Sequence, residues 1–337
     1  MSFVGSILLL AVLFLPLAWA VRVFLREMRG ERIPILCYHR FVRKQDVLSG
    51  RVADDEMGWV CYDDEFERQM DYLAEAGYTT LNLDELLEIQ EGRRARPARP
   101  IAITMDDGYQ SNYTQAFPVL RERGQKATIY VALEPDLHTR SQVEGIDGFL
   151  SPEELRELSS NGVSIQSHTL SHSILTELGD DEVRFELAES RRRLEEILGK
   201  PVEHFCFPRG GVDRRVRQLA RDAGYKSATG AHQGAVSQAS RAHDLPRINI
   251  DRDMNLDAFR KALEPRHAAV IHLIGELKGM ARRLVGPRRL REFRDLLHES
   301  PLRRLWSSVG LRRTAGVALS VYTVLSIAVV WSLFTKA

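Results

Sequence analysis

Apolar and polar residues are distributed unevenly along the chain, with an uncharged apolar stretch at each end and a patterned region between them. From about residue 33 to residue 263, short apolar runs alternate with segments whose apolar positions recur at helical spacing. The apolar runs predict strands with the sequences IPILCYH (33–39), YTTLNL (78–83), IAITM (101–105), KATIYVAL (126–133), VSIQS (163–167), VEHFCF (202–207), YKSAT (225–229) and LPRINI (245–250). The segments between them predict helices at 63–77, 83–92, 112–124, 151–162, 180–199 and 213–224.

The helix predicted at 151–162 has the clearest start signal. Ser151 is suited to the N-cap, Pro152 to the first turn, and Glu154 to the return bond of a capping box. Because strands and helices alternate without hairpin turns, the pattern predicts a parallel α/β sheet. Such a sheet is either a barrel or a doubly wound sheet.

The apolar stretches at the two ends are each long enough to cross a bilayer. At the N-terminus, Ala18-Trp19-Ala20 also fits the site at which a signal peptide is cleaved. The run is longer than a usual signal peptide core and no basic residue precedes it, which favours an uncleaved anchor. We therefore predict a transmembrane anchor at 1–25 and a transmembrane helix at 315–334, for which a buried core helix is the alternative.

Arginine is concentrated on the inner flanks of these two stretches. Four arginines lie between residues 22 and 32 and four between residues 303 and 313, whereas the outer flanks carry only Lys336 and the terminal amine. The positive-inside rule then predicts an integral protein of the cell inner membrane whose middle part faces the cytoplasm. A periplasmic or extracellular orientation is the alternative. The segment 264–313 predicts a basic amphipathic surface of the kind that lies on anionic membranes, with a solvated helix pair as the alternative.

Composition narrows the classes of function. The 337 residues carry a formal net charge of +1, so the chain has no overall attraction to nucleic acid, and no nucleic-acid partner is predicted. The three cysteines are scattered without the spacing of a metal site or a disulfide framework.

Polar side chains follow directly after several predicted strands. Asp106 and Asp107 come after IAITM, and His168 comes after VSIQS with His172 four residues on. Since the carboxyl ends of parallel strands meet on one face, we expect these side chains to lie close together. A carboxylate and two imidazoles suit a divalent metal of the zinc type. One aspartate can then ligate the metal while its neighbour accepts a proton from water.

Other polar positions are expected on the same face. His39 ends the first predicted strand, and Pro208, Arg209 and Gly210 follow the strand VEHFCF. Tyr109, just after the two aspartates, either lines a substrate cleft or starts a helix.

The segments TMDDGY, SHTLSH and FCFPRG resemble the first three motifs of the polysaccharide deacetylase family, the NodB-homology domain of carbohydrate esterase family 4. The resemblance extends over about residues 33–263 and implies a distorted (β/α) barrel. It also implies metal-dependent removal of an acyl group from a sugar. Asp106 is then the general base, and Asp107, His168 and His172 are the metal ligands. The backbone N–H of Arg209, where the family usually has tyrosine, helps to hold the oxyanion.

The chain departs from the family pattern at two motifs. Cys206 stands where an arginine often braces the base, so Arg247 or Arg209 is expected to supply that charge. The last motif, a Leu-His pair that provides the general acid, has no convincing match. His272 lies in a helical-looking run and favours a helix-face position, which leaves His39 as a candidate acid or pocket residue.

These observations predict a membrane-anchored, metal-dependent deacetylase that removes an N-acyl group, most simply acetyl, from an amino sugar. The substrate is a cell-envelope glycan or a lipid-linked saccharide, contacted by Tyr109, Pro208 and Gly210, and the metal is of the zinc type. Two alternatives stay open, namely a catalytically inactive glycan-binding barrel and an amidase with a different substrate. His204, inside the strand VEHFCF, is predicted to face outward.

Overall fold

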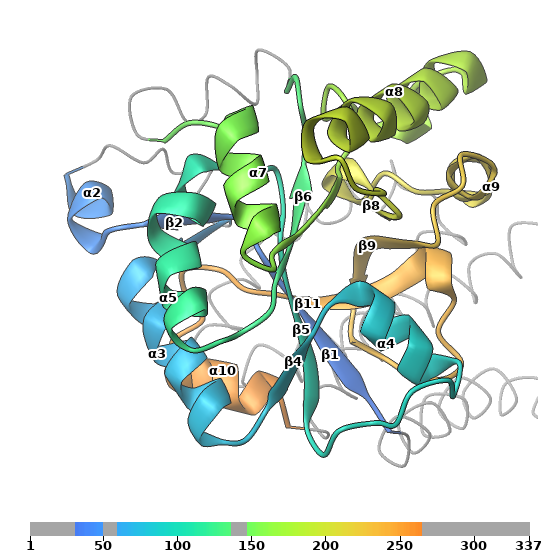
Figure 1. The fold of residues 1–337 in the computed structure, drawn as a ribbon. Helices are drawn as coiled ribbons and strands as arrows, with labels where there is room; N and C mark the ends of the chain where they lie inside the picture. The colour runs from blue at the N-terminus through green and yellow to red at the C-terminus, as the bar shows by residue number, and fades with distance from the viewer. Residues whose placement is uncertain (1–30, 50–58, 136–146, 265–337) are drawn as a thin grey trace, which may run out of the picture. The chain divides into compact units, whose positions relative to one another are not determined.

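A computed structural model describes residues 31–49, 59–135 and 147–264 (Figure 1). All of these except Glu264 belong to one compact unit with the limits Glu31–Leu263. These limits are close to the predicted 33–263. The predicted spans at 1–25 and 315–334, His272, and all but the first residue of the basic segment lie outside the described residues. Within the described ranges, the structure contains no helix with the length and apolar character that a membrane crossing requires.

Seven parallel strands close into a ring, which selects the barrel over the doubly wound sheet. Their order around the ring is β1-β11-β9-β8-β7-β6-β5, and β5 pairs back with β1. They are β1 (Ile33–Tyr38), β5 (Pro100–Met105), β6 (Thr128–Val131), β7 (Ser164–Ser167), β8 (His204–Cys206), β9 (Ser227–Gln233) and β11 (Leu245–Asn249). Each of these strands falls in a predicted apolar run, although β9 extends four residues past its predicted end.

The barrel is distorted because β5 has different neighbours at its two ends. Its first half pairs with β4 (Thr79–Leu81), and its last residues pair with β6. A short strand, β10 (Ala235–Val236), runs antiparallel to the start of β1. A separate parallel pair, β2 (Arg40–Val42) and β3 (Val60–Tyr62), continues the chain beyond β1.

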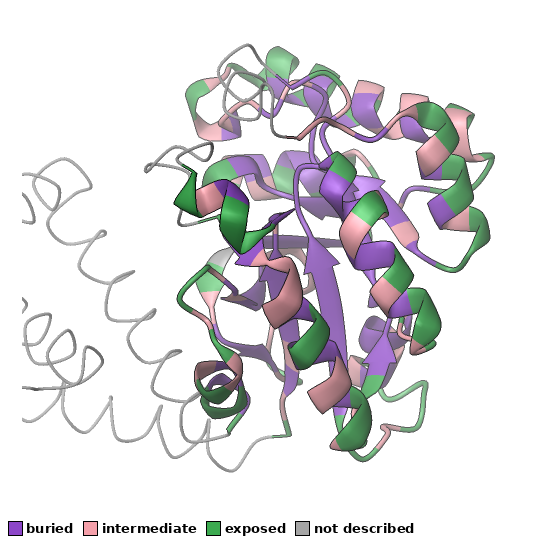
Figure 2. Ribbon diagram, turned by 90° about the vertical axis from the view of Figure 1, so that its left-hand side faces the viewer, coloured by how far each residue is buried: buried purple, intermediate pink, exposed green. Residues whose placement is uncertain are grey.

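Helices follow the strands and cover the barrel (Figures 1 and 2). They are α2 (Lys44–Leu48), α3 (Asp63–Glu75), α4 (Leu83–Gln90), α5 (Phe117–Glu122), α7 (Pro152–Ser160), α8 (Asp180–Leu198), α9 (Arg214–Asp222) and α10 (Leu256–Ala262), with a π-helical turn η2 (Asn112–Ala116) before α5 and short 3₁₀ turns η3 (Leu175–Glu177), η4 (Pro208–Gly210) and η5 (Ala242–Asp244). The predicted capping box of α7 is confirmed, since Ser151 accepts from the Glu154 N–H and Glu154 accepts from the Ser151 N–H.

The strands are buried on both faces, which explains why they read as continuous apolar runs and not as alternating ones. In β5, Ile101 and Ile103 pack with the core between strands and helices, whereas Ala102 packs with a second core inside the barrel. Helix α4 contributes four apolar side chains to this inner core, beside Ile33 and Leu245 at the starts of β1 and β11. The amino ends of the strands are therefore closed by apolar packing, and the carboxyl ends are left for polar side chains.

Candidate active site

The predicted polar residues meet at the carboxyl ends of the strands. Asp106 and Asp107 follow β5 directly, and His168 follows β7. The Nε2 atoms of His168 and His172 lie 3.3 and 3.2 Å from Oδ1 of Asp107. One possible ligand atom from each of Asp107, His168 and His172 lies within 4.8 Å of the other two. All three residues are buried. The three residues predicted to bind metal are thus brought together.

The turn after β5 is built to aim Asp107 into this group. Asp107 has a φ of 74°, and Gly108 follows with a φ of 77°. A Cβ on Gly108 would meet Val131 Cγ1 at 3.1 Å, so the glycine serves both the turn and the close approach to β6. His172 also has a positive φ, 64°. Such conformations cost roughly 1–3 kcal/mol each in residues other than glycine, and they persist where the surroundings over-determine them.

The contacts of His168 fit a bound cation. Its Nδ1 lies 2.8 Å from the carbonyl oxygen of Cys206, which can only accept, so Nδ1 carries the proton and Nε2 of the neutral ring has a lone pair. Burial disfavours the charged forms of both His168 and Asp107, but their neighbours outweigh burial, so the pKa of His168 is raised and that of Asp107 is held well below its usual value. A proton on Nε2 of His168 therefore faces Oδ1 of Asp107. A divalent cation in the place of this proton would leave the neutral ring with its Nε2 lone pair as a ligand. Two nitrogens and one carboxylate oxygen facing each other form a donor set of the zinc type.

Asp106 points into the barrel and is paired with Arg247 of β11. Two guanidinium nitrogens of Arg247 lie 2.6 and 2.7 Å from the two carboxylate oxygens, and both side chains are buried. Burial alone would raise the pKa of Asp106, but the Arg247 charge outweighs it and holds that pKa well below its usual value. Of the two arginines predicted to brace the base, Arg247 does so, whereas the side chain of Arg209 is exposed.

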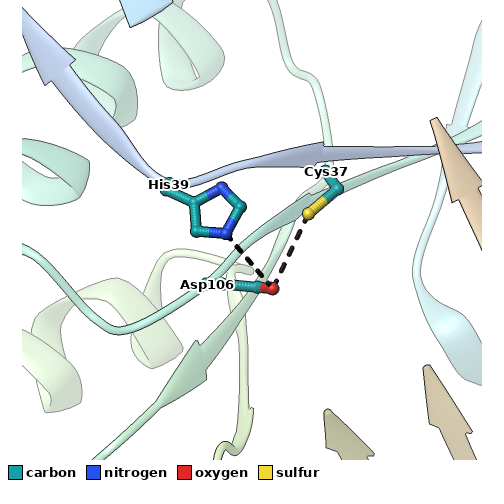
Figure 3. A group of neighbouring side chains, drawn as sticks. All are labelled: Cys37, His39 and Asp106. Carbon is teal, nitrogen blue, oxygen red and sulfur yellow. Dashed lines mark hydrogen bonds and ion pairs between the residues drawn. The ribbon is translucent and has the colours of Figure 1, made fainter. Parts of the chain in front are cut away.

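Two further side chains approach Asp106, as Figure 3 shows. The Cys37 thiol lies 3.6 Å and His39 Nε2 lies 3.8 Å from Oδ2 of Asp106. Burial raises the pKa of Cys37, so its thiol stays protonated and can donate to the carboxylate. Burial lowers the pKa of His39, although Asp106 and Asp107 act in the opposite direction. The Nδ1 atom of His39 is buried and has no hydrogen-bond partner among the described residues.

The residues predicted to contact substrate differ in exposure. Pro208 is buried and begins the turn η4, Arg209 follows with a φ of 51°, and Gly210 has a φ of 66°. Tyr109 is buried, and its ring stacks on Phe149 with centroids 5.4 Å apart. This stacking leaves little of the Tyr109 ring free to meet a ligand.

Residues 93–228 match the family model described as "Polysaccharide deacetylase". The resemblance of the motifs to the polysaccharide deacetylase family is thereby confirmed for this segment. The match places the chain among hydrolases of carbon–nitrogen bonds that act on sugar acetyl groups. The matched segment holds both aspartates and both histidines of the site. His39 and Arg247 lie outside it, and the closure of the barrel brings them to Asp106.

Curated relatives of this deacetylase agree with the family model. The Bacillus subtilis protein YxkH, described as a polysaccharide deacetylase, is 27% identical over 241 residues, which cover 72% of this chain and 79% of that protein. The poly-β-1,6-N-acetyl-D-glucosamine N-deacetylase of Escherichia coli K12 is 26% identical over 230 residues, covering 58% of this chain but only 34% of that enzyme.

Solved structures share the fold. The Streptococcus pyogenes deacetylase PplD in complex with acetate aligns with a TM-score of 0.62 at 23% identity, over 70% of this chain and 100% of that one. A polysaccharide deacetylase from Bacillus cereus aligns with a TM-score of 0.58 at 25% identity, over 70% of each chain. The predicted distorted barrel of this family is confirmed.

The structure corrects one expectation and adds one residue, Trp59, to the site of this deacetylase. His204 does not face outward, because it is fully buried and its Nδ1 lies 2.8 Å from Ser227 Oγ. Trp59 was not singled out from the sequence, yet its ring packs on His39 with centroids 4.8 Å apart and is half exposed. An aromatic residue directly before an apolar strand is a signal that could have pointed to it.

The buried pair gives a prediction about the stability of the deacetylase domain. Arg247→Met should lower the free energy of unfolding by about 3–5 kcal/mol, because it leaves the Asp106 charge buried without its partner. Adding Asp106→Asn should restore much of this loss, because it removes the uncompensated charge. Denaturant unfolding of the two variants and the parent would measure both effects.

The matched control is Arg192→Met on the exposed side of α8, where Arg192 pairs with Glu189. Exposed ion pairs contribute about 0–1 kcal/mol, so this variant should unfold almost like the parent. If Arg247→Met costs no more than Arg192→Met, the pair does not carry the energetic role assigned to it.

Proposed function

We propose that this deacetylase is metal-dependent and removes the N-acetyl group of an amino sugar in a cell-envelope glycan or a lipid-linked saccharide. One observation carries the proposal, namely that two consecutive aspartates have separate surroundings. Asp107 faces two imidazoles and suits a metal. Asp106 also lies near possible ligand atoms of His168 and Cys206, but both of its carboxylate oxygens are taken by Arg247, which favours a role as base. Two adjacent carboxylates are thereby given two different tasks.

Asp107, His168 and His172 would hold a divalent cation of the zinc type, which when bound would polarise the acetyl carbonyl and make water more acidic. Asp106 is placed to take the proton of the attacking water, since Arg247 keeps it ionised and ready at neutral pH. The same arginine makes Asp106 a weak base. A weak base suits a water whose pKa a bound cation would lower, so the two aspartates would act together.

The leaving nitrogen needs a proton, and His39 is in position to give one. Water adds to the amide carbon, the carbon–nitrogen bond breaks, and the products are acetate and an amine. Burial lowers the pKa of His39, so its ring is mostly neutral at neutral pH. It would therefore give the leaving nitrogen the proton that Asp106, 3.8 Å away, has taken from the attacking water. The backbone N–H of Arg209 stays our prediction for the donor to the oxyanion. Trp59 offers a half-exposed aromatic surface beside His39 for the apolar face of a sugar ring.

The choice of substrate is supported by the relatives. Those from Escherichia coli and Staphylococcus aureus are named as deacetylases of poly-β-1,6-N-acetyl-D-glucosamine, and PplD was solved with acetate. The assembled set of two aspartates, two histidines and Arg247 disfavours an inactive glycan-binding barrel, because such a barrel has no need of a buried charged site.

Replacing the two aspartates one at a time tests this division of tasks. Asp106→Asn should leave metal bound, since the ligands are untouched, and should lower turnover roughly 10²–10⁴-fold or more, the range for a positioned general base. Asp107→Asn should weaken metal binding, because a neutral amide is a poorer ligand for a divalent cation. Metal content by elemental analysis and turnover on N-acetylglucosamine oligomers would measure both.

His168→Ala serves as the control that removes an unambiguous ligand. Near-normal turnover of Asp106→Asn would contradict the mechanism. Full metal occupancy in a His168→Ala/His172→Ala variant would contradict the metal site.

If His39 is the general acid, a His39 variant should lose different amounts of rate on two kinds of substrate. His39→Gln should lower kcat about 10²-fold or more while metal content stays unchanged, because His39 is not a ligand. A substrate analogue with a leaving group that needs no proton should lose much less rate in the same variant. Equal losses for the two substrates would show that His39 does not act as the acid.

We further propose that the chain is an integral protein of the inner membrane, with the deacetylase domain on the cytoplasmic side. The arginines on the inner flanks of the two apolar stretches support this orientation. A reporter enzyme fused after Leu263 should then show cytoplasmic activity, and the N-terminal stretch should remain uncleaved. A mature N-terminus at Val21, found by sequencing, would instead place the domain outside and favour a polymeric substrate.

A further inference from the structure

Glu186 of helix α8 is a buried carboxylate to which the mechanism above gives no task. It lies against the loop that joins the two histidines of the site. Its Oε2 accepts hydrogen bonds from the backbone N–H groups of Leu170 and Ser171, at 2.9 and 3.0 Å. Its Oε1 accepts from the Ser171 hydroxyl at 2.7 Å. Only 8% of the residue is exposed.

The loop that Glu186 holds is strained. Thr169 and His172 have φ values of 69° and 64°, which are unfavourable for residues with a Cβ. The Thr169 hydroxyl accepts from the His172 N–H at 2.9 Å, and the Leu170 carbonyl accepts from the Glu134 N–H at 2.7 Å. Together with the hydrogen bonds that Glu186 accepts, these contacts hold the backbone of Leu170, Ser171 and His172.

The three hydrogen bonds that the Glu186 carboxylate accepts hold the loop in place. Hydrogen bonds to a charged acceptor are stronger than neutral ones, and the low dielectric of a buried site strengthens them further. Helix α8 is a rigid element of nineteen residues, so it transmits a fixed position to the loop. Through Glu186, helix α8 thereby fixes the orientation of the His172 imidazole.

We propose that Glu186 is a positioning residue of the metal site. Its carboxylate holds the strained loop so that His172 is aimed at Asp107 and His168, and its negative charge favours a divalent cation at this place. This inference rests on the metal dependence in the proposed function. It concerns affinity for the metal and the geometry around it, and it does not make Glu186 a ligand.

The test is the dissociation constant of zinc for the full-length protein in detergent, measured against a chromophoric chelator. Glu186→Gln keeps the size of the side chain but removes its negative charge, so the hydrogen bonds to the loop become weaker neutral ones even where the amide oxygen faces the two N–H groups. It should weaken zinc binding about 10–100-fold, the range found when partners that orient metal ligands are lost. Glu189→Gln, on the same helix but paired with Arg192 and Arg193, is the matched control and should bind zinc like the parent.

Cobalt substitution gives a readout that loss of stability alone would not change. The visible absorption of bound cobalt reports its coordination geometry, and it should differ between Glu186→Gln and the parent while Glu189→Gln matches the parent. If Glu186→Gln only lowers the melting temperature and leaves the zinc constant and the cobalt spectrum unchanged, the inference is overturned. If the parent itself binds no zinc, the proposed function fails first, so the two failures are distinguishable.

Discussion

The buried ion pair between Asp106 and Arg247 is the interaction on which the polar end of the barrel depends. It joins the ends of two strands that are far apart in sequence, and it does so inside a ring whose other end is packed with apolar side chains. Breaking such a pair leaves an uncompensated charge, which is far more costly than never having buried one. Because Arg247 also donates to Thr104 and contacts the Cys206 sulfur, one guanidinium links β11 to β5 and β8, three strands that are not neighbours in the ring, around Asp106.

The departure of this chain from its family is explained by that geometry. With cysteine at position 206, the third motif cannot brace the base with its own arginine, and a cation from β11 reaches the same carboxylate across the barrel. The Cys206 sulfur lies 3.4 Å from Asp106 Oδ2, and the Cys206 carbonyl fixes the tautomer of His168. One residue thus contacts the proposed base with its side chain and a proposed metal ligand with its backbone.

The positions of the ring strands could be predicted from the sequence, because strands buried on both faces read as apolar runs. The two aspartates and two histidines could be placed near one another, because they follow the carboxyl ends of such runs. Sequence patterns could not decide between Arg247 and Arg209, since this depends on which strand closes the ring. They placed His204 wrongly because a strand buried on both faces gives no alternation to read. They also missed β2 and β3, whose three residues each are too few to show a period.

Glu186 illustrates a signal that was present and not used. Val183, Leu187 and Leu194 form the buried stripe of α8, and Glu186 lies on that same stripe in an otherwise exposed, charged helix. An acid at a stripe position is costly to bury unless something nearby needs its charge or its acceptor atoms.

The charge balance of the site gives a reason for the burial of Glu186. Asp106, Asp107 and Glu186 bring three buried carboxylates to this end of the barrel, and Arg247 supplies one cation. Burial acts against a charge on His168, but its neighbours, Asp107 among them, raise the pKa of its imidazole, so a proton there supplies part of the balance. In the proposed function a divalent cation would take over that part and leave the imidazole neutral. The same balance explains why one aspartate is tied to an arginine: with both carboxylates free to ligate, the site would hold its metal but lack a base.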